Sequence, residues 1–386
     1  MEFSFLTAQK IVFKQGAINE LKNHIASLGT NFLVVVDPFF VKSPVMDNVR
    51  AQLEEMGKKY LVIGEVAGEP TVEQVDDICE RAVAFGCDAV MSIGGGSNID
   101  VGKAIAALIT NGTPAIDYME YVGKGKKVTV EPVPFISVPT TAGTGSEVTK
   151  NAVLGSHVLN FKRSMRSDSM MANLTIVDPA LTVGCPKSVT ANSGIDAMTH
   201  LIEAYTTWRA TPISDGLALK GIELGGKYLR RAYDDGKDME AREGMAAAAL
   251  MGGMAFANSG LGAAHGVGMA VGIQYGVPHG EACGIMLPHV MKLNAPVCQE
   301  RMARVGEALT GKRFASDAEA AQAAVDFIYE LTAHMNIKPD FKHLNIPEEA
   351  IKGLTMASFG TSMSSNPRRF DKEHPEELEA FIRTIV

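Results

Sequence analysis

Residues 89–100 read AVMSIGGGSNID, a short apolar strand that turns through three glycines into a helix. A glycine-rich turn at a helix N-terminus lets backbone N–H groups approach a pyrophosphate, and the helix dipole favours its negative charge. The alternative reason for the glycines is turn geometry alone. The segment therefore indicates an α/β fold and suggests where a dinucleotide would bind.

The sequence around this turn alternates apolar runs with helical patterns. The apolar runs span 32–36, 60–63, 89–93 and 134–138, and the helical patterns span 45–56, 72–85 and a stretch from about Asn98. This alternation is typical of a parallel sheet covered by helices. From Pro186 onward the pattern changes to long helices at 189–206, 213–232 and 239–258, with more after Pro288 and a terminal helix after Pro375.

We therefore predict an α/β domain with a parallel, Rossmann-like sheet over residues 1–185 and an all-helical domain over 186–386. The cleft between two such domains is the usual place for a site. The net charge of −8 gives no basic surface for nucleic acid or an anionic membrane. The uncharged stretch 244–280 is interrupted by many glycines, which favours closely packed buried helices over a membrane span.

The five cysteines are scattered and form no C-x-x-C pair, so we expect reduced thiols and no thiolate zinc site. The N-terminal residues carry no basic stretch followed by an apolar run, which predicts a cytoplasmic protein.

A candidate metal site lies in the second half of the chain. Asp196 and His200 are four residues apart and would share one helix face, and His265 and His279 fall in the uncharged stretch 244–280. One carboxylate and three imidazoles form a ligand set for a divalent transition metal. The alternatives are a chance polar pair on a solvated helix and core histidines bonded to backbone carbonyls.

Two further segments suggest NAD. Asp37 follows the strand at 32–36, where its carboxylate could accept hydrogen bonds from the adenosine ribose and would repel the 2′-phosphate of NADP. An ordinary Asp-Pro turn is the alternative. Residues 139–147, PTTAGTGSE, place hydroxyls and glycines at the carboxyl end of a strand and are expected to line the cofactor, unless they form only a structural turn. Because Asp37 precedes the glycine loop, the usual Rossmann fingerprint does not apply.

Five motifs in order, GGGSNID, VPTTAGTGSEVT, GIDAMTHLIEAY, AFANSGLGAAHG and VPHGEACGIMLPHV, resemble the iron-containing (group III) alcohol dehydrogenase family over nearly the whole chain. The resemblance implies a dehydroquinate synthase-like fold with an NAD-binding first domain and a metal-binding helical second domain. It implies metal ligands at Asp196, His200, His265 and His279, which with Lys162 near the nicotinamide make up the catalytic residues. The NAD contacts that it implies are Asp37, Gly94, Gly95, Gly96, Ser97, Asp100, Thr140, Thr141, Thr144 and Lys162.

The expected activity is hydride transfer between NAD(H) and a small alcohol or aldehyde whose oxygen is held by the metal. The family name favours Fe²⁺, although Zn²⁺ binds such ligands at least as well. A homodimer or larger homo-oligomer is expected. Two alternatives are a dehydroquinate synthase-type lyase, disfavoured by the few Lys and Arg near the motifs, and a metal- and NAD-binding protein without turnover. The second is motivated by Met269, which stands where many relatives have a histidine.

Overall fold

The computed structural model describes residues 2–156, 158–159 and 161–386. The chain forms two compact units. One, here called the sheet unit, comprises Leu6–Thr141 and Gly145–Thr182. The other, the helical unit, comprises Met1–Phe5, Ala142–Thr144 and Val183–Val386.

The sheet unit is built on a six-stranded parallel sheet in the order β1-β8-β5-β4-β2-β3. After β2 the chain adds β3 on one side and then β4 on the other, so the strand order reverses between β2 and β4. In open α/β sheets, ligands bind at the carboxyl ends of the strands beside such a reversal. The strands are β1 (Ile11–Phe13), β2 (Asn31–Val36), β3 (Lys59–Ile63), β4 (Ala89–Gly94), β5 (Phe135–Pro139) and β8 (Leu174–Val177).

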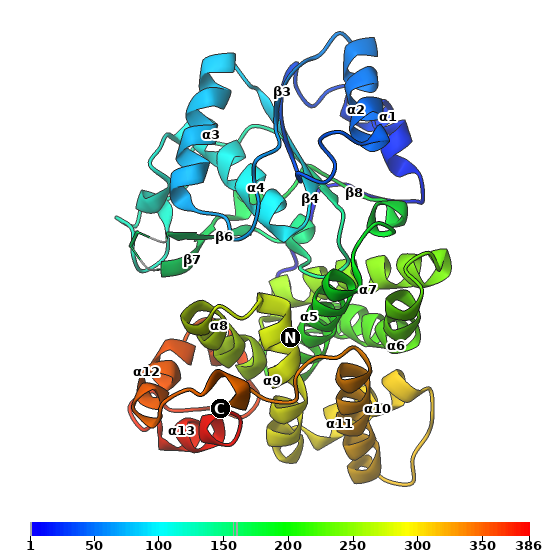
Figure 1. The fold of residues 1–386 in the computed structure, drawn as a ribbon, viewed down its shortest axis with the longest axis vertical. Coiled ribbons are helices and arrows are strands. Elements are labelled where there is room, and N and C mark those ends of the chain that lie inside the picture. Colours follow the sequence, from blue (N-terminus) through cyan, green and yellow to red (C-terminus); the bar gives the residue numbers. More distant parts are fainter. Residues whose placement is uncertain (1, 157, 160) are drawn as a thin grey trace. The chain divides into compact units, whose positions relative to one another are not determined.

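Helices cover both faces of this sheet. α1 (Lys22–Ile25) and α2 (Pro44–Glu55) lie on one side, and α3 (Val72–Phe85) and α4 (Gly96–Asn111) lie on the other (Figure 1). α4 packs closely because Gly102 has no side chain, since a Cβ there would lie 1.9 Å from Ser92 Oγ. Because α4 directly follows β4, its N-terminus lies at the carboxyl edge of the sheet.

Four short strands of the sheet unit have no counterpart among the predicted strands. β1 and β8 have three and four residues, too few to produce a periodic pattern. β6 (Asn151–Ser156) and β7 (Phe161–Arg166) form a separate antiparallel hairpin, and β7 reads FKRSMR, which lacks the apolar alternation of a buried strand. These segments therefore become strands through their pairing partners.

The helical unit consists of helices around one apolar core, as predicted from Pro186 onward. Pro288 lies inside α9 and does not end it. The helices are α5 (Lys187–Thr206), α6 (Pro212–Asp234), α7 (Met239–Ser259), α8 (Ala263–Tyr275), α9 (His279–Asn294), α10 (Gln299–Thr310), α11 (Asp317–His334), α12 (Glu348–Ser358) and α13 (Glu376–Arg383). The predicted fold class, a helix-covered parallel sheet followed by an all-helical region, is confirmed.

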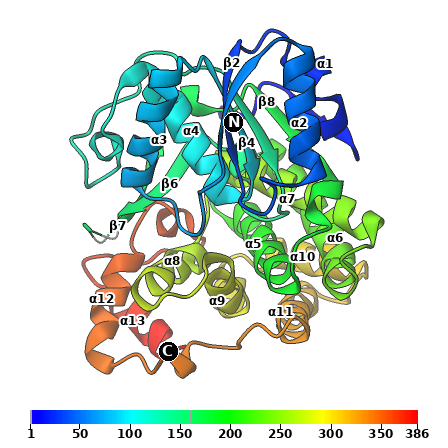
Figure 2. The same ribbon diagram turned by 45° about the horizontal axis from the view of Figure 1, so that its top comes forward.

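Glycines bring three of these helices into close contact. A Cβ on Gly280 would lie 2.2 Å from Asn192 O, and one on Gly284 would lie 2.7 Å from Ile195 Cγ2, so α9 approaches α5 along a glycine face. Gly268 brings α8 similarly close to α9, and Figure 2 shows these two helices side by side. The uncharged stretch 244–280 is therefore a set of tightly packed helices.

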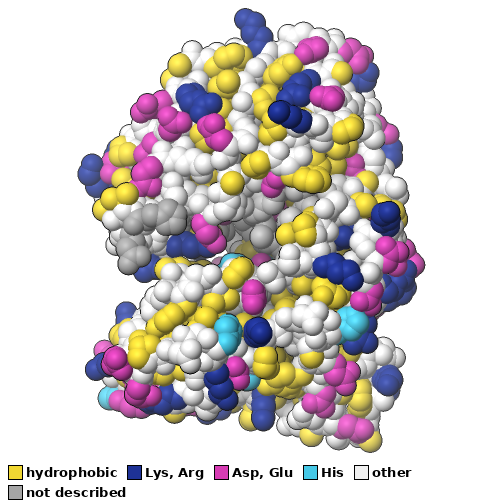
Figure 3. Space-filling model, viewed as in Figure 1, with side chains coloured by type: hydrophobic (Ala, Val, Ile, Leu, Met, Phe, Trp, Pro, Cys, Tyr) yellow, Lys and Arg dark blue, Asp and Glu magenta, His cyan; other side chains and the backbone are white. Residues whose placement is uncertain are grey.

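No helix within the described ranges combines the length and apolar character needed to cross a bilayer. On the face drawn in Figure 3, basic and acidic side chains are intermixed.

Candidate active site

The metal centre that the sequence suggests is built from three helices of the helical unit. α5 carries Asp196 and His200 one turn apart, α8 carries His265 in its first turn, and α9 begins with His279. The glycine contacts between α5, α8 and α9 bring these residues together.

Asp196 Oδ1 is the common neighbour of the three imidazoles. It lies 3.9 Å from His200 Nε2, 3.4 Å from His265 Nε2 and 3.7 Å from His279 Nε2. A tetrahedral site with metal–ligand bonds of about 2.1 Å separates its ligand atoms by about 3.4 Å. Each of the three imidazoles therefore stands at a distance from Asp196 Oδ1 that suits two ligands of one ion. The His200 ring stacks with the rings of Phe256 and His265.

Buried polar atoms without partners indicate that this centre holds a cation. Among the described residues, Asp196 Oδ1 and His265 Nε2 have no hydrogen-bond partner, although both side chains are almost fully buried. Leaving such atoms unpaired is costly, and a shared metal ion would satisfy both. An O,N,N,N set of this kind fits Fe²⁺ or Zn²⁺. His279 is the most open member, with 31% of its side chain exposed.

The charge states of Asp196 and His200 favour metal binding. Burial by itself raises the pKa of Asp196, but His200, His279 and His265 outweigh it and hold that pKa below its usual value, so the carboxylate is ionised. Burial lowers the pKa of His200 to about 3, against the opposing effect of Asp196, so this imidazole is neutral at physiological pH. An ionised carboxylate and a neutral imidazole are the forms that bind metals.

The structure brings Glu203, which the sequence patterns did not single out, into this centre. One oxygen accepts a hydrogen bond from Ala264 N at 2.7 Å and the other lies 2.6 Å from His265 Nδ1. Because a carboxylate oxygen only accepts, Nδ1 carries the proton, and Nε2 is the ring nitrogen left to bind a metal. Glu203 lies seven residues after Asp196, on the same face of α5, and that spacing was the available signal.

We expect Glu203→Gln to weaken metal binding by about 10- to 100-fold, as loss of a ligand's hydrogen-bond partner typically does. Glutamine has one acceptor and one donor group, so it would face either Ala264 N–H or His265 Nδ1–H with another donor. Metal titration into the stripped protein measures the effect. Glu243→Gln, on the exposed side of α7, is the control, and equal affinities in the two variants would refute this role for Glu203.

Cys283 also lies in this centre, although the sequence analysis assigned it no role. One ligand atom from each of Asp196, His265, His279 and Cys283 lies within 4.8 Å of the others. Burial raises the pKa of the Cys283 thiol, but the neighbouring His265 and His279 outweigh burial and the pKa lies below its ordinary value. The only sequence signal was its position one helical turn after His279.

The predicted nucleotide contacts lie mainly along one edge of the sheet unit. Asp37 follows β2 and its N–H donates to Ile93 O at 2.8 Å, and Thr140 N donates to Gly94 O at 3.0 Å at the end of β5. A Cβ on Gly95 would lie 3.6 Å from the Thr141 side chain. Asp37, the glycine loop and Thr140–Thr141 thus meet at the carboxyl ends of β2, β4 and β5, beside the point where the strand order reverses. Thr144 belongs to the helical unit.

The start of α4 has the properties of a phosphate-binding helix N-terminus. Gly95 is the N-cap and no side chain caps the helix, so the first N–H groups of Gly96 and Ser97 are available to an anion. Asp37 Oδ1 accepts from Phe39 N at 2.9 Å, which is the turn role considered as the alternative. That bond uses one carboxylate oxygen, so it is compatible with a ribose contact through the other.

Asp100, Lys162 and Met269, which the sequence analysis also named, are not among the residues that meet at the carboxyl ends of β2, β4 and β5. Asp100 is buried, and its oxygens accept hydrogen bonds from Ser146 Oγ and from Val153 N, which favours a role in holding the hairpin. Lys162, on β7, forms an ion pair with Glu69 at 2.5 Å. Met269 is half-buried on α8, one turn after His265, and is not part of the apolar core cluster.

Comparisons with known proteins decide the family. The family described as "Fe-containing alcohol dehydrogenase family, C-terminal" matches residues 190–381, and the one described as "Iron-containing alcohol dehydrogenase" matches residues 8–179. The chain belongs to the iron-containing alcohol dehydrogenase family. The resemblance read from the five motifs is thus confirmed.

Relatives in this family are oxidoreductases. The chain is 39% identical over 339 residues to Alcohol dehydrogenase 4 of Schizosaccharomyces pombe, covering 88% of this chain and 79% of that protein. It is 37% identical over 346 residues to Long-chain-alcohol dehydrogenase 1 of Geobacillus thermodenitrificans, covering 88% and 86%. The prediction of an oxidoreductase of the alcohol dehydrogenase type is confirmed.

Solved structures of oxidoreductases also have the fold of this chain. The crystal structure of a 1,3-propanediol oxidoreductase has a TM-score of 0.93 to this chain, with 31% identity and full coverage of both chains. A sulfoacetaldehyde reductase from Bifidobacterium kashiwanohense, solved in complex with NAD+, has a TM-score of 0.89 and 29% identity, with 99% of both chains covered.

Proposed function

We propose that this family member interconverts a small alcohol and its aldehyde by hydride exchange with NAD(H), at a divalent metal held by Asp196, His200, His265 and His279. The observation that supports it most directly is the buried, unpartnered Asp196 Oδ1 with three imidazole nitrogens 3.4 to 3.9 Å away. Fe²⁺ is the metal that the family name favours, and Zn²⁺ suits the same ligands.

In this proposal a bound divalent metal acts as a Lewis acid toward the substrate oxygen. The protein residues hold the site in the correct protonation states. Asp196 supplies the negative charge, and Glu203 holds a proton on His265 Nδ1 so that Nε2 is the nitrogen that would bind the metal. Met269 has no titratable group, so we assign proton exchange to water and the ribose hydroxyls.

NAD(H) is the proposed cofactor, in keeping with the NAD+ in the sulfoacetaldehyde reductase structure. The N-terminus of α4 would bind the pyrophosphate through Gly95, Gly96 and Ser97. Thr140 and Thr141 lie beside that loop, and Asp37 lies at the end of β2, one strand away. The roles of Lys162, Asp100 and Thr144 remain predictions from the family resemblance.

An NADH absorbance assay with aldehydes, in the presence of added iron or zinc, tests the proposal. The panel should be broad, because relatives are named for methanol, choline, long-chain alcohols and sulfoacetaldehyde. Metal-dependent NADH oxidation with at least one aldehyde is expected. Binding of NAD(H) and metal without turnover on any substrate would instead favour the non-enzymatic alternative.

We expect Asp37→Gly to relax the preference for NAD(H) over NADP(H). The wild-type carboxylate would lie where NADP carries its 2′-phosphate, and like charges about 4 Å apart repel by at least about 1 kcal/mol, or about fivefold in KM. Steady-state kinetics with both cofactors measure the change. Asp37→Asn is the informative control, because it retains an acceptor for Phe39 N while removing the charge.

Both variants should accept NADPH better than the wild type if charge decides the preference. A wild-type enzyme that already uses NADPH as well as NADH would show that Asp37 does not lie at the ribose. The cytoplasmic location and the homodimeric or larger assembly remain predictions from the sequence.

A further inference from the structure

The metal centre contains one potential ligand beyond the proposed four. Cys283 is fully buried on α9, one turn after His279, and its Sγ lies 3.8 Å from His279 Nε2 and 3.9 Å from His279 Nδ1. A tetrahedral metal with one sulfur bond of about 2.3 Å and one nitrogen bond of about 2.1 Å separates those atoms by about 3.6 Å. Cys283 therefore stands at a ligand's distance from its neighbour.

We infer that Cys283 is an additional thiolate ligand of the active-site metal in this chain, beside Asp196, His265 and His279 of the proposed four. This inference rests on the proposed metal site. When the metal binds, the thiol loses its proton to solvent and sulfur donates an electron pair to the metal.

Two observations beyond the cysteine itself support this assignment. Asp196 Oδ1 and His265 Nε2 are buried and unpartnered within the described part of the chain, and both belong to the same group of atoms as Cys283 Sγ. His200 lies outside that group, against the face of His265. The centre thus extends along α9 toward the sulfur as well as along α5 toward His200.

A thiolate changes which metal the site prefers. Sulfur is a softer ligand than imidazole or carboxylate and favours Zn²⁺ over Fe²⁺. Position 283 thereby becomes a determinant of metal choice.

Loading the stripped protein with Co²⁺ tests the inference, because a cobalt–thiolate bond produces a near-ultraviolet charge-transfer band. We expect the wild type to show that band together with the visible bands of protein-bound cobalt. Cys283→Ser should lose the near-ultraviolet band and keep the visible ones. Cys298→Ser is the matched control, since its Sγ bonds to Asn294 O outside this centre, and it should retain both.

X-ray absorption of the zinc-loaded wild type provides a second measurement that needs no variant to fold. One sulfur at about 2.3 Å is expected, in addition to nitrogen and oxygen ligands. Bound metal with only nitrogen and oxygen neighbours would overturn the role of Cys283 and leave the proposed function standing. Failure of the wild type to bind cobalt or zinc at all would instead overturn the metal site itself.

Discussion

His279→Ala is expected to lose its metal and about a thousandfold or more of its turnover. Lewis-acid activation contributes several kcal/mol to transition-state stabilisation, and each 1.4 kcal/mol corresponds to about tenfold in rate. Among the proposed ligands, His279 is the best one to remove because it is partly exposed and begins α9. Replacing His265 would also leave one oxygen of the buried Glu203 without its partner.

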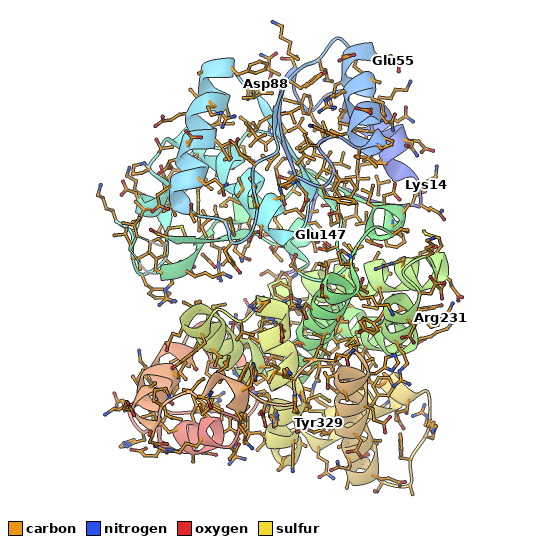
Figure 4. All side chains as sticks on the ribbon, viewed as in Figure 1. Lys14, Glu55, Asp88, Glu147, Arg231 and Tyr329 are labelled. Atoms are coloured by element: carbon orange, nitrogen blue, oxygen red, sulfur yellow. The ribbon has the colours of Figure 1, made fainter. Side chains whose placement is uncertain are left out.

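Metal analysis of the purified protein and the NADH assay measure both losses. His289→Ala is the matched control, since it lies on the same helix α9 but bonds to Pro339 O at 2.8 Å and to Tyr329, labelled in Figure 4. We expect this control to keep its metal and activity. Wild-type metal content and turnover in His279→Ala would eliminate His279 as a ligand.

The second large effect is expected from Lys103→Met, in the interior of the sheet unit. Lys103 on α4 is 1% exposed, and its ammonium donates to Ser146 O at 2.7 Å and to Asn151 O at 2.8 Å. Burial lowers its pKa to about 8, against the opposing effect of Asp100 and Glu147, so it is still largely charged at pH 7. This single side chain ties α4 to the loop and hairpin that follow β5.

Removing this ammonium leaves buried acceptors and Asp100 uncompensated. Breaking a buried ion pair by removing one partner typically costs about 3–5 kcal/mol. The neighbouring Glu147, labelled in Figure 4, has its pKa raised to about 7 by burial, and Lys103 opposes that shift. Loss of Lys103 should therefore raise the pKa of Glu147 further and favour its neutral form.

Denaturant unfolding and amide hydrogen exchange measure this effect. We expect lower stability and faster exchange in α4 and in the hairpin at Asn151–Ser156 and Phe161–Arg166. Lys22→Met is the control in the same unit, because both partners of its ion pair with Glu55 are exposed and the pair should contribute little. Indistinguishable exchange in the two variants would refute the structural role of Lys103.

Apolar runs and helical periodicity in the sequence were enough to predict much of the fold. The apolar runs became β2, β3, β4 and β5, and α3 spans Val72–Phe85 as its periodicity predicts. Long helices and strands can be recognised from the sequence because their side-chain period repeats many times. β1, β8 and the β6–β7 hairpin were missed because they are short or polar and depend on partners far away in the chain.

The sequence by itself determined the family, through five motifs in order, and the residue types of a metal centre. Only the tertiary structure decided how those residues meet. Glycine contacts between α5, α8 and α9 place Asp196 Oδ1 among three imidazoles. The same packing brings in Glu203 and Cys283, whose only signal in the sequence was helical spacing from a predicted ligand. The physical reason is that ligand geometry depends on distances between helices, which local sequence patterns do not encode.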